Sequence, residues 1–478
     1  MSTQVKKVKR IELVIVPGKS LGPFRLGTSL WDIIQFLRER SLFFPKVELK
    51  YSDQDPLRNT IIISLPVNGI NLWFDGSLQR LKSIECFDPT KVKLVYQNGD
   101  VSSSRTIPTF LLIYKSFGPT YPGEFNSQKS VYTLNYPGLS FIFPIPQKHH
   151  YIYKNSSDLP MEFPDGTTPI ANSVYLFHSQ SKNWESVALP PLTKIITDIN
   201  SGSSMKYGKV GRREVESVVA KISKGIKLYF PVSTQSDLSK EKLTTEQVDI
   251  LLNVTPLQDI LADLGKPSRI FYKEEDKMKI HSVADESSTL IKSNGKMESS
   301  IGLINSSIDD ERDINTNNAT DYFLNYFHLG LDILIDGTQH ICKKIILHGN
   351  IPGHYDFQRY KRCPFKLVFP KSLVEKRQNN SKLLVDVECD PDEEKVPLNT
   401  VTAQMKITTM QHRIPWISSN IITTKTSDET QLEQQKPVIL TRGSNEQNPF
   451  GSTYLTGYSE GIVMEVMKNG YVPTIVLF

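Results

Sequence analysis

The chain repeats itself near its middle, and this repeat constrains the fold more than any other feature of the sequence. Residues 28–34 read Thr-Ser-Leu-Trp-Asp-Ile-Ile, and residues 255–261 read Thr-Pro-Leu-Gln-Asp-Ile-Leu. A second stretch, residues 69–76 (Gly-Ile-Asn-Leu-Trp-Phe-Asp-Gly), returns as residues 330–337 (Gly-Leu-Asp-Ile-Leu-Ile-Asp-Gly). Residues shared between copies of a repeat serve the fold, so we interpret them as scaffold before considering chemistry.

Each clear copy contains an amphipathic helix, recognised by apolar residues at positions i, i+3, i+4 and i+7. The stripes are Leu30, Ile33, Ile34 and Leu37, then Leu257, Ile260, Leu261 and Leu264, with a weaker one at Phe110, Ile113, Tyr114 and Phe117. We expect the first helix to start at Thr28 or Ser29, because both side chains can cap a helix N-terminus. For the helix after residue 254 we expect Thr255 as the cap and Pro256 at the first helical position.

Apolar and polar residues alternate after each helix, which predicts an antiparallel meander of strands. The last stretch of the chain, residues 461–467 and 471–478 around Asn469-Gly470, has the same strand, turn and strand layout. We therefore predict an α+β fold of about four repeated helix-plus-antiparallel-meander units packed in pairs, with disordered polar insertions. The fourth unit is expected to have lost or hidden its helix. The alternative is two unrelated α+β units that share common patterns.

These patterns divide the chain into two pairs of units, residues 11–225 and residues 226–478. The polar residues 282–318 cannot bury enough apolar surface to offset chain entropy, which predicts a disordered insertion. Residues 376–399 and 423–436 are expected to be flexible polar loops for the same reason. The insertions carry either regulatory phosphorylation sites or nothing beyond tolerated extra length.

Composition excludes several classes of protein. The chain has 478 residues and a net charge of +5, which is too small for its length to indicate nucleic acid as a partner. The apolar run at residues 11–16 ends at Pro17-Gly18 and is too short for a signal peptide or a membrane-spanning helix. The four cysteines, Cys86, Cys342, Cys363 and Cys389, are scattered without metal or redox spacing. We therefore expect a cytoplasmic protein with free thiols.

No motif for nucleotide binding, nucleophilic catalysis or zinc binding occurs in the sequence. The best candidate cluster is residues 271–282, where Glu275, Asp276 and His281 could bind a metal or move protons. A charged hairpin corner is the simpler interpretation of that cluster. His348 and His354, which flank a Pro-Gly turn, form a second candidate pair, but a similar Pro-Gly turn at residues 121–125 favours a scaffold role. We therefore predict no catalytic residue, metal or cofactor.

Five segments in the same order carry a resemblance to a known family. They are Ser20-Leu21-Gly22, residues 271–282, residues 321–327 leading into Leu329-Gly330, Pro352-Gly353-His354-Tyr355 with Arg362-Cys363, and residues 448–453 (Asn-Pro-Phe-Gly-Ser-Thr). On these residues the chain resembles the phagophore assembly factor 1 family, from about residue 11 to the last residue. The polar inserts at 282–318 and 376–436 are long for that family.

The resemblance implies a non-enzymatic cytosolic protein with a regulatory role in autophagy. It implies a β-propeller partner similar to breast carcinoma-amplified sequence 3, and recruitment with this partner to the phagophore assembly site. In the family, phosphoinositide binding is credited to the propeller, so association with membranes would be indirect. No catalytic residue carries over.

Long loops at one end of a sheet commonly carry binding residues, so we expect the partner surface on three of the family segments. The predicted residues are Asp276, Lys277, Lys279, His281, Pro352, His354, Tyr355, Asn448 and Phe450. Two alternatives stay open. The basic N-terminus is compatible with a direct lipid or membrane adaptor in Golgi or endosomal vesicle traffic, and His281 with its neighbours is compatible with a metal-dependent hydrolase.

Overall fold

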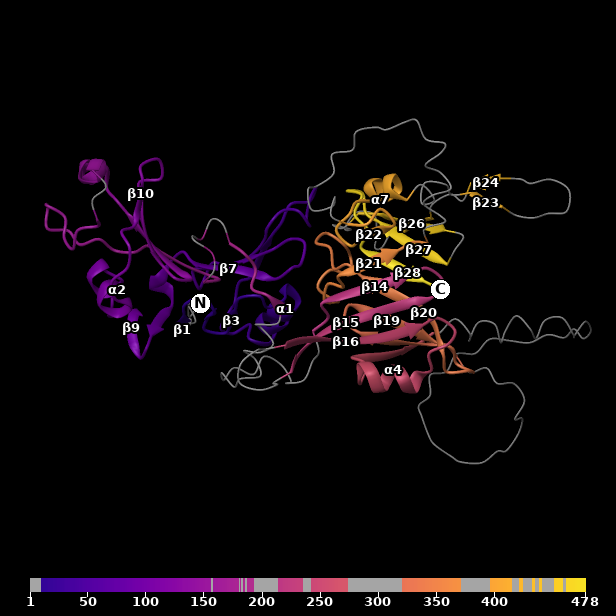
Figure 1. Cartoon of the computed structure of the whole chain (residues 1–478). Coiled ribbons are helices and arrows are strands. Elements are labelled where there is room, and N and C mark those ends of the chain that lie inside the picture. Colours follow the sequence, from indigo (N-terminus) through magenta and orange to yellow (C-terminus); the bar gives the residue numbers. More distant parts are fainter. Residues whose placement is uncertain are drawn as a thin grey trace, which may run out of the picture.

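A computed structural model shows the chain as two similar halves that lie side by side (Figure 1). The structure describes residues 10–155, 158–179, 181, 184, 187–192, 214–234, 242–273, 320–370, 396–414, 421–423, 432–434, 438–440, 451–458 and 461–478. Each half contains two units, so the predicted α+β repeat of four helix-plus-meander units packed in pairs is confirmed.

The N-terminal half consists of two successive units. Unit 1 comprises β1 (Glu12–Val16), β2 (Ser20–Leu21), β3 (Phe24–Arg25), α1 (Leu30–Glu39), β4 (Glu48–Lys50), β5 (Ile61–Leu65), β6 (Ile70–Phe74) and β7 (Leu81–Cys86). Unit 2 comprises β8 (Lys93–Tyr96), β9 (Gly99–Ser102), α2 (Phe110–Phe117), β10 (Glu124–Asn126), β11 (Val131–Tyr136), β12 (Leu139–Pro144) and β13 (Ser173–Phe177). Two 3₁₀ helices, η1 (Pro89–Lys91) and η2 (Gln147–Asn155), connect these elements.

The C-terminal half repeats this order. Unit 3 comprises β14 (Ser217–Lys221), β15 (Gly225–Thr234), β16 (Lys242–Leu251), α4 (Leu257–Leu264), β17 (Arg269–Tyr272), β18 (Tyr322–Tyr326), β19 (Leu331–Ile335) and β20 (Cys342–His348). Unit 4 comprises β21 (Phe365–Val368), β22 (Thr400–Thr402), α7 (Ile407–Arg413), β25 (Val438–Leu440), β26 (Thr453–Tyr458), β27 (Ile462–Val466) and β28 (Thr474–Leu477). A small hairpin, β23 (Ile421–Thr423) with β24 (Leu432–Gln434), stands apart from the large sheets.

Both halves have the same sheet topology. A five-stranded sheet has the order β3-β2-β1-β8-β9 in one half and β16-β15-β14-β21-β22 in the other. An eight-stranded sheet has the order β10-β11-β12-β13-β7-β6-β5-β4 in one half and β25-β26-β27-β28-β20-β19-β18-β17 in the other. The two units of a half meet where β1 pairs in parallel with β8, or β14 with β21, and where β13 pairs with β7, or β28 with β20.

One backbone device recurs in all four units. The residue before each helix forms an isolated bridge with a residue one or three positions ahead of the last strand of the unit: Ser29 with Arg80, Thr109 with Ile170, Pro256 with Ile341, and Lys406 with Tyr471. The first helical N–H then donates to a neighbouring carbonyl in each case: Leu30 to Gln79, Phe110 to Pro169, Leu257 to His340, and Ile407 to Gly470. Since this device needs no particular side chain, it persists where the sequence similarity is lost.

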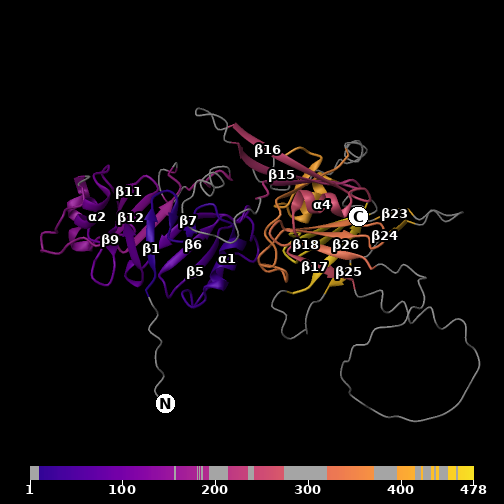
Figure 2. The same cartoon turned by 90° about the horizontal axis from the view of Figure 1, so that it is seen from below.

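Each half has its own hydrophobic core between its helices and sheets. In α1 the predicted stripe is buried as expected, with Leu30 and Ile33 fully inside. In α4 only Ile260 is fully buried, and Leu261 is 38% exposed. The view from below shows the long β15–β16 hairpin reaching beyond the two layers, where unit 1 has only the short strands β2 and β3 (Figure 2). The two halves therefore differ at this edge of the five-stranded sheet although their topology is the same.

One open expectation is resolved and two need correction. The helix of the fourth unit is hidden in the sequence and not lost: it is α7, whose N-cap Lys406 makes no side-chain capping bond. The second half starts before residue 217 and not at 226, because β14 pairs with β21 of its own half. In α4 Pro256 occupies the N-cap position, and the Thr255 hydroxyl accepts from the Leu251 N–H instead.

The predicted flexible segments lie mostly outside the described residues. Residues 282–318 lie outside the described residues, as does most of 376–399. The predicted loop 423–436 contains β24, which pairs with β23, so this part is strand and not irregular loop.

Ser29 is expected to stabilise α1 through its side chain. Its hydroxyl oxygen accepts from the Asp32 N–H at 3.1 Å and its hydroxyl donates to the Asp32 carboxylate at 2.6 Å. Replacing Ser29 with Ala should lower the free energy of unfolding by about 1 kcal/mol, because a helix N–H loses its acceptor. Ser29→Asn retains a capping oxygen and should cost much less. Urea denaturation of both variants measures the difference, and equal losses would contradict a capping role.

Candidate functional site: the joint between the halves

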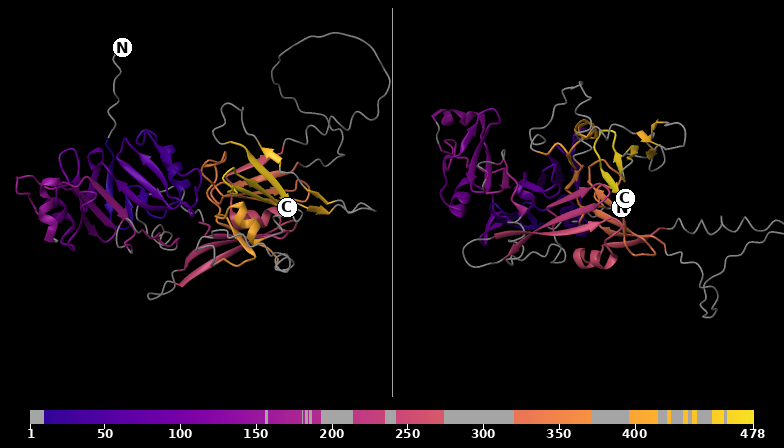
Figure 3. Two further views of the ribbon diagram at one scale, coloured as in Figure 1. Left: turned by 90° about the horizontal axis from the view of Figure 1, so that it is seen from above. Right: turned by 45° about the vertical axis from the view of Figure 1, so that its right-hand side comes forward.

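The family segment around Pro352-Gly353 lies in the loop of residues 349–364, which connects β20 to β21. Helix α1 lies on the side of the N-terminal half that faces the C-terminal half (Figures 1 and 2). The loop meets this helix, because the Trp31 indole N–H donates to the Arg359 carbonyl at 3.2 Å and Arg38 donates to the Gln358 side chain at 2.8 Å. The view from above also shows the two halves side by side, with this joint between them (Figure 3).

A reciprocal amide pair lies at the centre of the joint. Asn350 Nδ2 donates to Gln79 Oε1 at 2.8 Å, and Gln79 Nε2 donates to the Asn350 carbonyl at 2.6 Å. Gln79 is 1% exposed and Asn350 is 5% exposed, so neither amide can form these bonds with water instead. Both residues have positive φ, of 53° and 47°, which places them in tight turns. The pair therefore fixes two turns, one from each half, against each other.

Arg362 fastens three segments through backbone carbonyls. Its guanidinium donates to the carbonyl of Ser77 at 2.6 Å, to that of Ala403 at 3.1 Å and to that of Gly349. Burial lowers the pKa of the Arg362 guanidinium to about 10. The planar donor fork compensates for this desolvation with hydrogen bonds that a lysine could not make together.

Lys361 binds two carboxylates beside Arg362. Its ammonium lies 3.0 Å from the Asp32 carboxylate and 2.6 Å from that of Glu214. Burial by itself would lower the pKa of Lys361, but the charges of Asp32 and Glu214 outweigh burial and raise it. Because Asp32 belongs to α1 and Glu214 lies three residues before β14, this ion pair network also joins the two halves.

The two candidate histidines are held inside the C-terminal half. His354 Nδ1 accepts from the Asp356 N–H at 3.3 Å, so Nε2 carries the proton and donates to Glu465 Oε1 at 3.1 Å. Thr453 donates to the same carboxylate oxygen at 2.6 Å. His354 and Glu465 are each 4% exposed. This arrangement ties the loop to β26 and β27 and leaves no face of the imidazole open to a substrate.

His348 is part of a second buried network. Its Nε2 lies 3.0 Å from the Asp332 carboxylate, and the Tyr360 hydroxyl donates to the same oxygen at 2.7 Å. The His348 and Tyr360 rings stack with centroids 3.6 Å apart. Asn325 donates to the other oxygen of Asp332 at 2.8 Å. Burial raises the pKa of Tyr360, with the Asp332 charge as the next cause. Equivalent cross-strand pairs, Ser64 with Asn71 and Asn135 with Ser140, occupy this position in units 1 and 2, so the position belongs to the scaffold.

An apolar contact and an ion pair complete the joint. Leu57 of unit 1 packs with Ile351, Met467 and Tyr471 in a small separate core. The Asp55 carboxylate lies 2.7 Å from the Lys406 ammonium and accepts from the Tyr471 hydroxyl at 3.2 Å. Units 1, 3 and 4 therefore all contribute side chains to the joint.

The Asp55 contacts predict a pH dependence of stability. The hydrogen bond from Lys406 is the main cause that lowers the pKa of Asp55. A lowered carboxyl pKa stabilises the fold above the unfolded-state pKa of about 4, and this contribution is lost as pH falls through the folded-state value. Asp55→Asn should therefore melt below the wild type at pH 6, and the gap should shrink towards pH 3. With Lys406→Met as the background, Asp55→Asn should produce a much smaller gap at pH 6. An unchanged gap in that background would exclude Lys406 as the cause.

The structure describes some of the predicted partner-surface residues and not others. Pro352 and His354 are buried, so their prediction as partner-surface residues is wrong, and His354 instead ties the loop to Glu465 of β27. Tyr355 is 55% exposed. Asp276, Lys277, Lys279, His281, Asn448 and Phe450 lie outside the described residues. Sequence reasoning missed Gln79, Asn350 and Lys361, whose only signal was a polar residue in a short turn.

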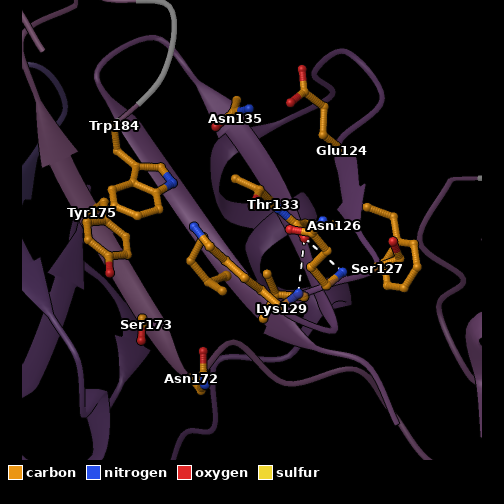
Figure 4. A pocket seen from close by; sticks show the side chains of 14 residues that line it. Glu124, Asn126, Ser127, Lys129, Thr133, Asn135, Asn172, Ser173, Tyr175 and Trp184 are labelled. Atoms are coloured by element: carbon orange, nitrogen blue, oxygen red, sulfur yellow. Dashed lines mark hydrogen bonds between the residues drawn. The ribbon is translucent and has the colours of Figure 1, made fainter. Parts of the chain in front are cut away.

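A separate groove of about 530 Å³ lies on the open face of the N-terminal eight-stranded sheet (Figure 4). Residues of β10 to β13 and of the β10–β11 turn line most of it, and Trp184 closes one side by stacking on Tyr175 with ring centroids 4.2 Å apart. The Lys129 ammonium lies 5.7 Å from the Trp184 ring. Hydroxyl and amide groups beside an aromatic wall suit a polar ligand. Since its residues are spread between positions 124 and 184, no single motif indicated it.

Two observations bear on metal binding and membranes. Within the described residues, no group of three His, Cys, Asp or Glu side chains is placed to hold a metal ion together. The helices in the same part of the chain include none that is long and apolar enough to cross a membrane. Cys86, Cys342 and Cys363 are free and buried, and burial raises the pKa of each thiol to about 12.

Two α+β halves of identical topology, fastened through an internal joint, define the class of protein to which this chain belongs. The family model described as phagosome assembly factor 1 matches residues 20–297 and 291–478. The chain therefore belongs to the phagosome assembly factor 1 family, which confirms the resemblance.

Curated relatives agree with the family match. A PHAF1 protein of Arabidopsis thaliana is 31% identical over 463 residues, which cover 97% of this chain and 92% of the relative. A PHAF1 protein of Drosophila melanogaster is 31% identical, with 98% of this chain and 94% of the relative covered. A PHAF1 protein of Caenorhabditis elegans is 27% identical, with 95% and 90% covered. No solved structure matches the chain significantly.

Proposed function

We propose that the chain is a non-enzymatic interaction protein with a regulatory role in autophagy. The observation that carries the proposal is the match to the phagosome assembly factor 1 family over nearly the whole sequence. The joint supports it, because its side chains best suited to catalysis are all hydrogen-bonded within the scaffold. These are His348, His354 and Arg362. In this proposal the chain acts in the cytoplasm together with a β-propeller partner, and the two are recruited to the phagophore assembly site.

Among the partner-surface candidates in the loop of residues 349–364, Tyr355 is the exposed one. It directly follows the buried His354. A large aromatic side chain on a loop that buried hydrogen bonds hold in place can anchor a partner at little cost in conformational entropy. Asp276, Lys277, Lys279, His281, Asn448 and Phe450 stay in the proposed partner surface.

Affinity purification from starved cells tests the proposal. The tagged full chain should recover a β-propeller protein that is absent from cells without the tag. Tyr355→Ser should reduce this recovery, whereas Tyr121→Ser, which alters a tyrosine that is 89% exposed and belongs to unit 2, should not. Repeated purification without any propeller protein would refute the proposed partner.

Membrane association is proposed to be indirect. Vesicles that contain phosphoinositides should float the chain only when the propeller partner is present. Flotation of the purified chain alone would favour direct lipid binding, as expected of an adaptor in vesicle traffic.

A further inference from the structure

The edges of the two eight-stranded sheets differ sharply in chemistry. In the N-terminal half the edge strands are β4 (Glu-Leu-Lys) and β10 (Glu-Phe-Asn). In the C-terminal half they are β17 (Arg-Ile-Phe-Tyr) and β25 (Val-Ile-Leu). Edge strands usually carry charges that prevent unwanted pairing, and exposed apolar edges attract further strands. The C-terminal half therefore has edges suited to strand addition, and the N-terminal half does not.

Strand β17 is apolar and open on both faces. Ile270 is 49% exposed, Phe271 is 42% exposed and Tyr272 is 61% exposed. Ile270 and Tyr272 lie opposite Leu324 and Tyr322, which are 1% and 8% exposed. Since residues opposite each other share a sheet face, Ile270 and Tyr272 extend the core face beyond the part that the protein covers.

Unit 1 shows what fills the equivalent place. There Leu49 of β4 lies opposite the buried Ile63 and packs against the N-terminal core. The connection from α1 to β4, residues 40–47, contributes Phe44, which is 3% exposed and packs on Phe24 and Phe36. In unit 3 the connection from α4 to β17 spans only residues 265–268 and has no aromatic residue. Unit 3 therefore has no aromatic counterpart of Phe44 ahead of its edge strand, and the apolar side chains of β17 stay exposed.

The backbone of β17 presents bonding groups at its open edge. The Lys273 N–H donates to the Asp321 carbonyl at 3.1 Å, so residues 273, 271 and 269 direct their backbone groups to β18. Backbone direction alternates along a strand in an antiparallel pair. Ile270 and Tyr272 therefore direct their N–H and C=O groups outward, where no strand of the described chain pairs with them.

Charge identifies the kind of strand that fits. Arg269 and Lys273 stand at the two ends of the strand, and no acidic residue lies between them. Two copies of β17 can pair antiparallel only in registers that place outward-directed residues of one copy opposite outward-directed residues of the other. In the register centred on Phe271, all of residues 269–273 are paired. Arg269 then lies opposite Lys273 of the second copy, and like charges in that position are destabilising. A strand with acidic ends is complementary, so a different protein fits better than a second copy.

We propose that β17 is a docking edge at which an extended segment of a partner protein adds a ninth strand to the sheet, with apolar side chains beside Ile270 and Tyr272 and acidic ones beside Arg269 and Lys273. This inference rests on the proposed function, since it specifies a surface through which an interaction protein takes its partner. Main-chain hydrogen bonds supply the affinity in this mode of recognition, and the alternating side chains supply the specificity.

A cyclic hairpin peptide tests the docking edge directly. Its outer strand reads Glu-Val-Thr-Ile-Glu, and its matched control has Lys in place of both Glu residues. Fluorescence anisotropy with the full chain should show binding of the acidic peptide at least about tenfold tighter than that of the basic one. Ile270→Pro removes an outward-directed N–H that makes no hydrogen bond to β18. Tyr272→Lys replaces an exposed aromatic side chain with a charged one. Both variants should weaken binding at least about tenfold and melt close to the wild type.

Each of the following results would overturn the proposal. They are equal binding of the two peptides, no binding at about 1 mM, undiminished binding by a folded Tyr272→Lys variant, and a stable wild-type dimer that Ile270→Pro dissociates, which would assign the edge to a second copy. Peptide binding that appears only after deletion of residues 282–318 would mean that the chain covers its own edge, and also contradicts it. Because the peptide assay needs no cellular partner, failure of the affinity purification with intact peptide binding would refute the proposed function alone.

Discussion

Deletion of residues 471–478 is expected to yield insoluble protein. The deletion removes β28, which pairs with β20 on one side and β27 on the other and so joins units 3 and 4. Ile475 and Leu477 are fully buried in the C-terminal core. Without this strand the eight-stranded sheet divides and exposes two new edges in addition to a large apolar surface. The measurement is the soluble fraction after expression.

The control for this deletion is removal of Phe478 alone. Phe478 is 44% exposed and follows the end of β28, so its loss should leave the protein soluble and folded. A soluble truncation at residue 470 that melts like the wild type would contradict the central position of β28.

Arg362→Met is expected to lower the free energy of unfolding by about 3 kcal/mol or more. The methionine fills most of the space but leaves three buried carbonyls, those of Ser77, Gly349 and Ala403, without their donor. Each buried acceptor that loses its partner costs about 1 kcal/mol or more. Since Ser77 belongs to unit 1 and Ala403 to unit 4, the substitution should also loosen the joint. Urea denaturation would then show separate transitions for the two halves in place of one.

Two further variants control this prediction. Arg359→Met alters an arginine of the same loop whose side chain is 48% exposed, and it should cost less than about 1 kcal/mol. Arg362→Lys retains the charge without the donor fork and should lie between the wild type and Arg362→Met. Equal stability of Arg362→Met and Arg359→Met would mean that Arg362 does not hold the joint.

Much of the fold was predictable because its signals are local. The stripes of α1, α2 and α4 occur where the sequence places them, since helix periodicity and the buried face need only neighbouring residues. The last hairpin was predictable from Asn469-Gly470 between apolar runs, and it appears as the turn between β27 and β28.

Helix α7 was not predictable. Its sequence, Ile-Thr-Thr-Met-Gln-His-Arg, is short and contains two β-branched threonines after an isoleucine, which disfavour an isolated helix. Met410 and Ile414 are fully buried, so packing against the C-terminal core holds this helix in place. Tertiary contacts therefore override a weak local preference.

The candidate site was predictable only as a segment of interest. The sequence identified the loop with Pro352 and His354, but it could not show that Glu465, 111 residues further along the chain, would accept the imidazole proton. A buried histidine and a ligand-binding histidine look the same in a sequence, because the partners that distinguish them are brought close only by the fold.

The sequence by itself determined the repeat, the helix stripes, the alternating strands and the family. Each of these depends on periodicity or composition within a short window. Only the tertiary structure decided how the halves are joined, through pairs such as Gln79 and Asn350, which are 271 residues apart. It also decided that, within the described residues, β17 is an edge strand and β28 a central strand. Burial and complementarity across such separations depend on where folding brings each segment, and local patterns do not encode that.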